Sequence, residues 1–209
     1  MKAHTRETQA TMTPQKSLQY LKEGNQRFQN NLKANRNLLE QVNDTRDGQF
    51  PFATILSCID SRVSAELVFD QGLGDIFSVR IAGNFVNEDI LGSMEFASKL
   101  AGTKLIVVLG HTSCGAIKGA CDNAKMGNLT KLIEKITPAV KAVTEPKDAK
   151  LRNSTNSEFV DNVSHMNVKL TMERIHAESP ILSEMEKNGE ILIVGAMYDI
   201  NTGEVTFFE

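Results

Sequence analysis

Three residues whose types could do chemistry together stand at alternate positions in the segment ILSCIDSRVSAE, residues 55–66. They are Cys58, Asp60 and Arg62, and they follow an apolar run directly. A second segment further along the chain, VVLGHTSCGAIKG, places His111 and Cys114 in the same way behind an apolar run. Two thiolates and one imidazole are a ligand set that suits zinc, so the two segments together predict a zinc site.

Each of these residues also has a structural interpretation. Cys58 alone could be a small buried apolar residue. Asp60 and Arg62 alone could form a surface ion pair that adds little stability. The occurrence of Cys58 and of the His111–Cys114 pair behind two apolar runs favours a metal site. Three protein ligands would leave a fourth tetrahedral position for water, which is typical of a catalytic zinc ion.

Asp60 has two possible roles beside such a metal. It could be a fourth ligand, or it could accept a hydrogen bond from water or hydroxide on the zinc. Arg62 favours the second role, because a bidentate arginine–carboxylate pair fixes the carboxylate and keeps it ionised. Cys121 lies in a helical stretch without a partner at ligand spacing, so we expect it to pack in the core.

Four short apolar runs would form the strands that position these residues. Each is almost continuously apolar, as expected for strands covered on both faces. Helical patterns separate the runs, so the predicted fold class is α/β with a mainly parallel central sheet of four strands flanked by helices. The segment NTGEVTFFE predicts a turn into a C-terminal edge strand antiparallel to its neighbour. The four runs are 52–58, 75–83, 104–111 and 190–199.

The order of these runs predicts where the site lies. Functional sites in open parallel sheets collect beyond the carboxyl ends of the strands. Cys58 ends the first run, whereas His111 and Cys114 follow the third. If the first and third strands are neighbours, the three side chains converge.

The amino-terminal part of the chain predicts a helical arm, residues 1–50, on an α/β zinc core of residues 51–209 within a single domain. Residues 13–32 predict a helix with Thr13 as N-cap and Pro14 as its first residue. This helix is polar enough that we expect it to pack on a partner subunit rather than on its own core. Residues 31–50 indicate a connector, and 144–157 is the most loop-like stretch.

Composition restricts the class of protein. The 209 residues are 41% hydrophobic and 23% charged, with a formal net charge of −3. An acidic chain of this kind argues against nucleic acid or a membrane as the main partner. The amino terminus lacks the apolar core of a signal peptide, so we expect a cytoplasmic protein, or a periplasmic one only if Met1 follows a removed signal. Three cysteines, an odd number, argue against a disulfide framework.

The motifs CIDSR at 58–62 and GHTSCGAIKG at 110–119 resemble those of the β-class carbonic anhydrase family, in its bacterial, plant-like branch. The segments ELVFDQGLGDIFSVRIAGN and ILIVGAMYDINTGEV are also similar to bacterial members. The resemblance runs from about residue 21 to the C-terminus, and two motifs in this order at this separation are highly specific.

This resemblance implies an enzyme, a carbonate dehydratase, which reversibly converts CO2 and water into bicarbonate and a proton by attack of zinc-bound hydroxide. It implies one Zn²⁺ per chain on Cys58, His111 and Cys114. Asp60 would accept a hydrogen bond from the hydroxide and would be held by Arg62. In a closed state of the site, Asp60 would itself bind the metal.

The resemblance also implies a substrate pocket. Gln49 would orient the substrate, and the backbone amide of Gly115 would lie close to the substrate oxygens. Phe77, Ala82 and Phe96 would line a small apolar pocket, partly from a neighbouring subunit, in a homodimer or homotetramer. Two departures leave the route of the proton unspecified. Phe96 stands where plant enzymes have a tyrosine, and Leu100 where a proton-transferring histidine can occur.

Three alternatives compete with CO2 hydration. Hydrolysis of CS2 or COS occurs on the same scaffold, and one sequence does not separate it from hydration. A catalytically silent, zinc-stabilised assembly protein would need neither Asp60, Arg62 nor Gln49. Nucleotide binding by GHTSCGAIKG is weakly supported, because this loop lacks both G-x-x-x-x-G-K-[ST] and G-x-G-x-x-G.

Overall fold

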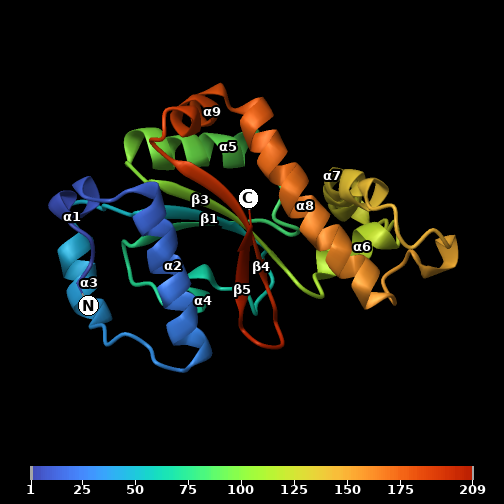
Figure 1. Cartoon of the computed structure of the whole chain (residues 1–209), viewed down its shortest axis with the longest axis horizontal. Coiled ribbons are helices and arrows are strands. Elements are labelled where there is room, and N and C mark those ends of the chain that lie inside the picture. Colours follow the sequence, from blue (N-terminus) through green and yellow to red (C-terminus); the bar gives the residue numbers. More distant parts are fainter. Residues whose placement is uncertain (1, 209) are drawn as a thin grey trace.

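The computed structural model describes residues 2–208 as one five-stranded sheet with helices on both faces (Figure 1). The strand order is β2-β1-β3-β4-β5. The first four strands pair in parallel, and β5 runs antiparallel to β4, so the predicted fold class is confirmed. The strands are β1 (Ala53–Ser57), β2 (Ile76–Arg80), β3 (Leu105–His111), β4 (Leu192–Tyr198) and β5 (Val205–Phe208).

The predicted helices are present, and two short ones are added, α1 before the first predicted helix and α3 in the connector. Among the described residues, no helix combines the length and apolar character needed to cross a lipid bilayer. The α-helices are α1 (Arg6–Ala10), α2 (Pro14–Gln29), α3 (Leu38–Thr45), α4 (Ala65–Val68), α5 (Glu88–Glu95), α6 (Gly115–Cys121), α7 (Gly127–Ala142), α8 (Ser157–Glu178) and α9 (Pro180–Lys187). A π-helical turn, η1 (Phe96–Leu100), continues α5, and a 3₁₀ turn, η2 (Ala149–Leu151), lies in the predicted loop.

Successive strand residues point to opposite faces of the sheet, and each face has its own helices. Ile55 belongs to a core cluster that includes residues of α2 and α4. Leu56 belongs to a second cluster with residues of α5, α8 and α9. A third cluster gathers beyond the carboxyl ends of β1 and β3, where α6, α7 and the first turns of α8 pack together. Figure 1 shows these three helices beside one end of the sheet.

One strand differs from the prediction that all four are covered on both faces. Every residue of β1 and β3 is buried, but β2 alternates between half-buried and exposed positions. The reason is its place at the edge of the sheet, next to β1 alone. Its exposed residues are Ser78 and Arg80, whereas its apolar side chains are half-buried, so β2 forms an incompletely covered edge of the single chain.

The first long helix also departs from its predicted packing. Thr13 caps α2 by accepting a hydrogen bond from the Lys16 amide at 3.2 Å, as the sequence predicts. Leu21, however, is fully buried in the chain's own core. The Asn25 side chain is buried as well, donating to the Gly203 carbonyl and accepting from the Val205 amide, both at 2.9 Å. This helix therefore seals the core of its own chain.

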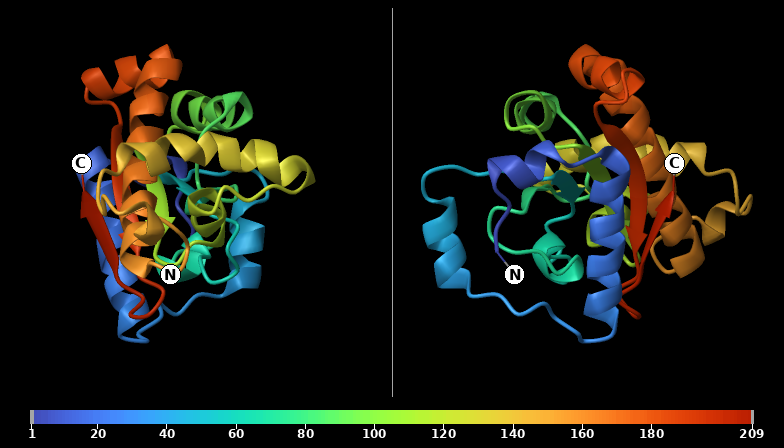
Figure 2. Two further views of the ribbon diagram at one scale, coloured as in Figure 1. Left: turned by 90° about the vertical axis from the view of Figure 1, so that its right-hand side faces the viewer. Right: turned by 60° about the vertical axis from the view of Figure 1, so that its left-hand side comes forward.

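The predicted connector contains a helix that the sequence analysis missed. Asn37 caps α3, and Gln41 is its only buried residue. Because its leucines point to solvent, α3 lacks the apolar periodicity that reveals a helix in a sequence. The connector before α3 is held by the buried Asp70 carboxylate, which accepts from Arg36 at 2.6 Å. Figure 2 shows the long connector between α2 and α3.

We predict opposite effects on stability when two helical glycines are replaced by alanine. A Cβ on Gly24, in α2, would overlap the backbone carbonyl oxygen of Phe69, whereas a Cβ on Gly92, in α5, would meet nothing within 4 Å. We expect Gly24→Ala to lower the free energy of unfolding by about 1–3 kcal/mol through overpacking. The matched Gly92→Ala should raise it by about 0.5–1 kcal/mol, because alanine favours a helix. Urea unfolding measures both, and equal effects at the two sites would contradict this packing.

Candidate metal centre

The sheet brings the ends of β1 and β3 together. The two strands are parallel neighbours, and Ser57 lies opposite Leu109 in their register. Cys58 directly follows Ser57, and His111 lies two residues after Leu109. The convergence that the sequence predicted at these carboxyl ends is thus a consequence of the strand order.

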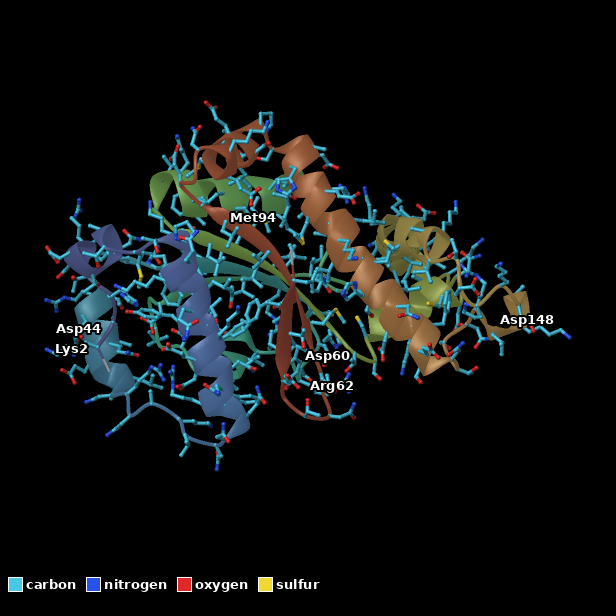
Figure 3. All side chains as sticks on the ribbon, in the orientation of Figure 1. Lys2, Asp44, Asp60, Arg62, Met94 and Asp148 are labelled. Carbon is cyan, nitrogen blue, oxygen red and sulfur yellow. The ribbon has the colours of Figure 1, made fainter. Side chains whose placement is uncertain are left out.

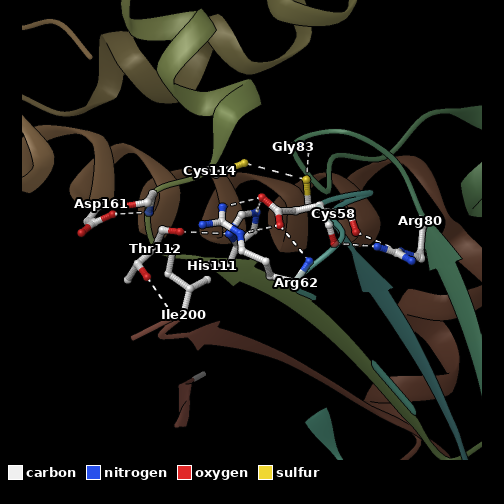
Figure 4. A network of polar contacts seen from close by, with 11 residues as sticks. Cys58, Arg62, Arg80, Gly83, His111, Thr112, Cys114, Asp161 and Ile200 are labelled. Atoms are coloured by element: carbon white, nitrogen blue, oxygen red, sulfur yellow. Dashed lines mark hydrogen bonds and ion pairs between the residues drawn. The ribbon is translucent and has the colours of Figure 1, made fainter. Parts of the chain in front are cut away.

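Three side chains gather at this place. One ligand atom each from Cys58, His111 and Cys114 lies within 4.8 Å of the others, and all three residues are buried. The two sulfur atoms are 3.8 Å apart. Cys58 comes from the end of β1, His111 from the end of β3, and Cys114 from the N-cap position of α6 (Figure 4). The ligand set therefore consists of a local pair, His111 and Cys114, and the distant Cys58.

The orientation of His111 fits a metal ligand. Its Nδ1 lies 3.0 Å from the Thr112 carbonyl oxygen, so Nδ1 carries the proton that this bond needs. Its Nε2 is buried and has no hydrogen-bond partner among the described residues, and a ring nitrogen of His111 lies within 4.8 Å of both sulfur atoms. Leaving a buried polar atom unpaired costs free energy, and a metal bound at Nε2 removes that cost. The donor set and its orientation both suit zinc.

The two cysteine side chains are hydrogen-bonded to each other through one thiol proton. A hydrogen bond from Cys114, with a further one from the Gly83 amide, lowers the pKa of Cys58 to about 4. The bond to Cys58, together with burial, raises the pKa of Cys114 above its ordinary value. A metal that binds both sulfurs would displace this proton. By contrast, burial raises the pKa of Cys121 to about 11, and that thiol packs against the third core cluster.

Asp60 and Arg62 form the predicted clamp. Asp60 Oδ1 accepts from the Arg62 amide at 3.0 Å and from Arg62 Nε at 2.9 Å, and Oδ2 accepts from Nη2 at 2.7 Å. These bonds lower the pKa of Asp60, so the carboxylate stays ionised. Asp60 Oδ2 is also 3.9 Å from His111 Nε2, so the carboxylate borders the cluster. Figure 3 shows Asp60 and Arg62 together below the middle of the sheet.

Sequence analysis missed a second arginine that organises this loop. Arg80, the last residue of β2, donates from Nε to the Cys58 carbonyl at 3.0 Å and from Nη2 to the Asp60 carbonyl at 2.8 Å. It therefore connects the edge strand to the backbone that carries a ligand and the clamp. A basic residue inside the otherwise apolar run IFSVRIA was the available signal.

Two predicted pocket residues lie together at the sheet edge. The ring centroids of Phe77 in β2 and Phe96 in η1 are 6.3 Å apart. Both rings line an open hollow of about 740 Å³, which Arg80 also borders. Phe77 pairs with Thr54 near the start of β1, so this hollow extends away from the cluster along the edge.

The other predicted substrate residues are more widely spread. Gln49 is exposed and precedes β1, at the opposite end of this strand from Cys58. Within one chain, the structure does not bring Gln49 to the cluster. Ala82 lies in the turn after β2, next to Gly83, whose amide donates to Cys58 Sγ at 3.4 Å. Gly115 begins α6 directly after Cys114, with open space where a side chain would stand.

Comparison with known proteins agrees with this geometry. The family model described as carbonic anhydrase matches residues 53–205. Carbonic anhydrase 2 of Mycobacterium tuberculosis is 38% identical over 192 residues, which cover 88% of this chain and 87% of the relative. The solved β-carbonic anhydrase CcaA superposes with a TM-score of 0.72 at 25% identity, covering 92% of this chain and 95% of that one. One chain from the crystal structures of two tetrameric β-carbonic anhydrases of Sordaria macrospora shares the fold, with a TM-score of 0.67 at 20% identity, over 81% of this chain and 89% of the solved one.

Proposed function

This chain belongs to the carbonic anhydrase family, and we propose that Cys58, His111 and Cys114 hold one zinc ion at which CO2 is reversibly hydrated to bicarbonate and a proton. One observation carries the proposal. His111 Nε2 is buried without a partner among the described residues, at the point where the two cysteine sulfurs also converge. A site of this composition with three protein ligands leaves one position for water or substrate.

Zinc in such a site supplies a nucleophile at neutral pH, because it lowers the pKa of a coordinated water toward about 7. The chain's own residues orient that nucleophile. Asp60 is ionised by its bonds to Arg62, so its oxygens accept hydrogen bonds and donate none. We propose that Asp60 accepts the hydrogen of the attacking group, which turns the lone pair of that group toward the carbon of CO2. Arg62 binds both oxygens of this carboxylate and would hold it away from a metal bound by the three ligands.

The substrate side of the proposal involves Gly115 and a second copy of the chain. The Gly115 amide begins a helix beside Cys114, and we propose that it donates to the oxygen on which charge develops. Gln49 would orient the substrate, and Phe77, Ala82 and Phe96 would line the apolar pocket. Gln49 and Phe96 are exposed in the single chain, and we propose that a partner subunit covers this edge and completes the pocket.

Exposed apolar side chains support self-association. Leu38, Leu67 and Leu73 line one surface hollow of about 330 Å³ and are each at least 44% exposed. The hollow that Phe77 and Phe96 line lies along β2, whose outer edge pairs with no other strand among the described residues. Apolar surface of this kind marks protein interfaces. We expect sedimentation equilibrium to give at least twice the chain mass of 23.0 kDa, and Leu67→Glu to shift the mass toward 23.0 kDa. A parent that sediments as a monomer would contradict this.

Substrate preference tests the proposed reaction against its alternatives. We expect the zinc-loaded protein to hydrate CO2 rapidly and to hydrolyse CS2 and COS slowly or not at all. The Arg62 clamp on Asp60 argues against a silent scaffold, because a structural metal needs no oriented carboxylate. The test compares the rate of CO2 hydration, measured by stopped flow with a pH indicator near pH 8.5, with the rates of CS2 and COS hydrolysis at the same enzyme concentration. Fast CS2 or COS hydrolysis with slow hydration would overturn the assignment.

A further inference from the structure

We propose that helix α8 positions both cysteine ligands of the metal centre through two polar side chains, Asp161 and Asn167. Neither residue touches the ligand atoms. Each instead holds a backbone unit next to one of the cysteines, Asp161 on the side of Cys114 and Asn167 on the side of Cys58. The inference rests on the proposed zinc site and assigns its geometry to a helix outside the two ligand motifs.

Asp161 holds the turn between His111 and Cys114. Ser113 lies in this turn with φ of 55°, a left-handed conformation that residues with a side chain seldom adopt. The Ser113 amide donates to Asp161 Oδ1 at 3.0 Å. This bond is available only while Ser113 keeps its conformation, so Asp161 stabilises a backbone shape that directs Cys114 toward the cluster. Figure 4 shows Asp161 beside the turn.

The other side of the same turn is fixed by the sheet. The Thr112 amide donates to the Tyr198 carbonyl at 3.0 Å, and Thr112 Oγ1 accepts from the Ile200 amide at 3.1 Å. These bonds place Thr112 and do not involve Ser113, the next residue. Asp161 is therefore the side chain that fixes the last residue before Cys114.

Asn167 acts on Cys58 through Gly83. The Asn167 side chain is 3% exposed, and its Nδ2 donates to the Gly83 carbonyl at 2.8 Å. Gly83 in turn donates its amide to Cys58 Sγ at 3.4 Å. Gly83 has φ of 79°, and a Cβ there would overlap Ile136, so this position requires glycine. A flexible residue needs an external hold, and Asn167 supplies it.

Helix α8 is suited to this task because it is long and packed. It runs for 22 residues, and apolar residues such as Val163 and Val168 are fully buried in two of the core clusters. Asn167 stands on the same buried side as these valines, where a polar residue needs a partner. Groups that orient metal ligands in this way commonly change metal affinity by about 10–100-fold when removed.

The role of Asp161 is tested by the zinc affinity of the full chain, which competition with a chromophoric chelator measures. We expect Asp161→Ala to weaken zinc binding by about 10–100-fold. Asp161→Asn keeps an acceptor oxygen and should stay within about threefold of the parent. Adding Ser113→Gly to Asp161→Ala should recover most of the loss, because glycine adopts positive φ without help. Recovery is the decisive result, since general damage to the fold would not be repaired by it.

Cobalt substitution tests the Asn167 arm by a spectroscopic readout. We expect Asn167→Ala to shift the sulfur-to-cobalt charge-transfer band, because the Gly83 amide would no longer be held against Cys58 Sγ. The matched control is Ser164→Ala in the same helix. Ser164 is as buried as Asn167, but its hydroxyl has no hydrogen-bond partner among the described residues, so its removal should leave the charge-transfer band and the zinc affinity unchanged. The inference is overturned if Asp161→Ala binds zinc like the parent, if Ser113→Gly restores nothing, or if Ser164→Ala acts like Asn167→Ala. A parent without zinc affinity would instead refute the zinc site itself.

Discussion

Asp60→Asn should leave one zinc ion per chain bound and lower kcat/KM for CO2 hydration by about 100-fold or more. Asparagine preserves the size of the side chain but replaces an acceptor oxygen by an NH2 group. In the parent, Arg62 donates three hydrogen bonds to the two carboxylate oxygens. The asparagine amide has only one acceptor oxygen, because its NH2 group is a donor. The nucleophile would then lose its oriented acceptor while the three metal ligands remain. Stopped-flow hydration and metal analysis on the same sample measure the two effects.

The matched control for this change is Asp47→Asn. Asp47 is also paired with an arginine, Arg46, but its side chain is 85% exposed and lies outside the site. Its replacement should change neither zinc content nor turnover. If Asp60→Asn kept zinc and full turnover, the role assigned to Asp60 would be wrong. If it lost zinc, Asp60 would be acting as a ligand.

His111→Ala should produce the largest loss, with zinc affinity reduced more than about 100-fold and hydration below about 1% of the parent at equal zinc and protein. The imidazole is the one nitrogen ligand of the cluster, and its removal leaves two sulfur atoms 3.8 Å apart. Two ligands do not hold zinc in a tetrahedral site of normal affinity. Chelator competition measures the affinity, and metal-free thermal unfolding shows whether the fold survives.

A histidine elsewhere on the surface serves as the control. His176 lies on α8 with Nε2 2.5 Å from Glu186, outside the metal centre. His176→Ala should keep one zinc per chain and parental hydration, whatever it does to the contact between α8 and α9. Retention of zinc and activity by His111→Ala would show that the metal lies elsewhere.

The part of the fold that follows from apolar runs was predictable. The runs around Ile55, Val107 and Val194 are buried on both faces, and each forms a central strand. Because the motif residues follow directly on such strands, the convergence of Cys58 with His111 and Cys114 could also be predicted from their order. An apolar run is a local property of the sequence, whereas the place of the strand in the sheet, which also decides its burial, is not.

The elements that the sequence analysis misjudged depend on position rather than composition. The run at Ile76–Arg80 is as apolar as a central strand, but the sheet places it at the edge. Helix α3 is held by its Asn37 cap and by Gln41, which accepts from the Leu73 amide at 3.2 Å. Contacts of this kind join residues far apart in the chain and leave no periodic trace.

The site divides in the same way. Its ligands stand in two compact motifs whose residue types and spacing predict a zinc site, whereas the role of Asp60 and Arg62 was predicted from the resemblance of these motifs to a known family. Arg80, Asp161 and Asn167 act through single hydrogen bonds to backbone groups of distant loops. Asn167 left one trace, a polar residue in line with buried Val163 and Val168. Side chains that hold a loop need only an acceptor or donor at the right place, so residue type alone does not reveal them.

Titration of the metal-free protein with zinc, followed by the initial rate of CO2 hydration, tests the central claim most directly. The account predicts no hydration above background without metal, a linear rise as zinc is added, and a plateau at one zinc per chain. Binding of one zinc ion per chain without any rise in hydration would contradict it, because the cluster of Cys58, His111 and Cys114 would then hold a metal that serves another purpose.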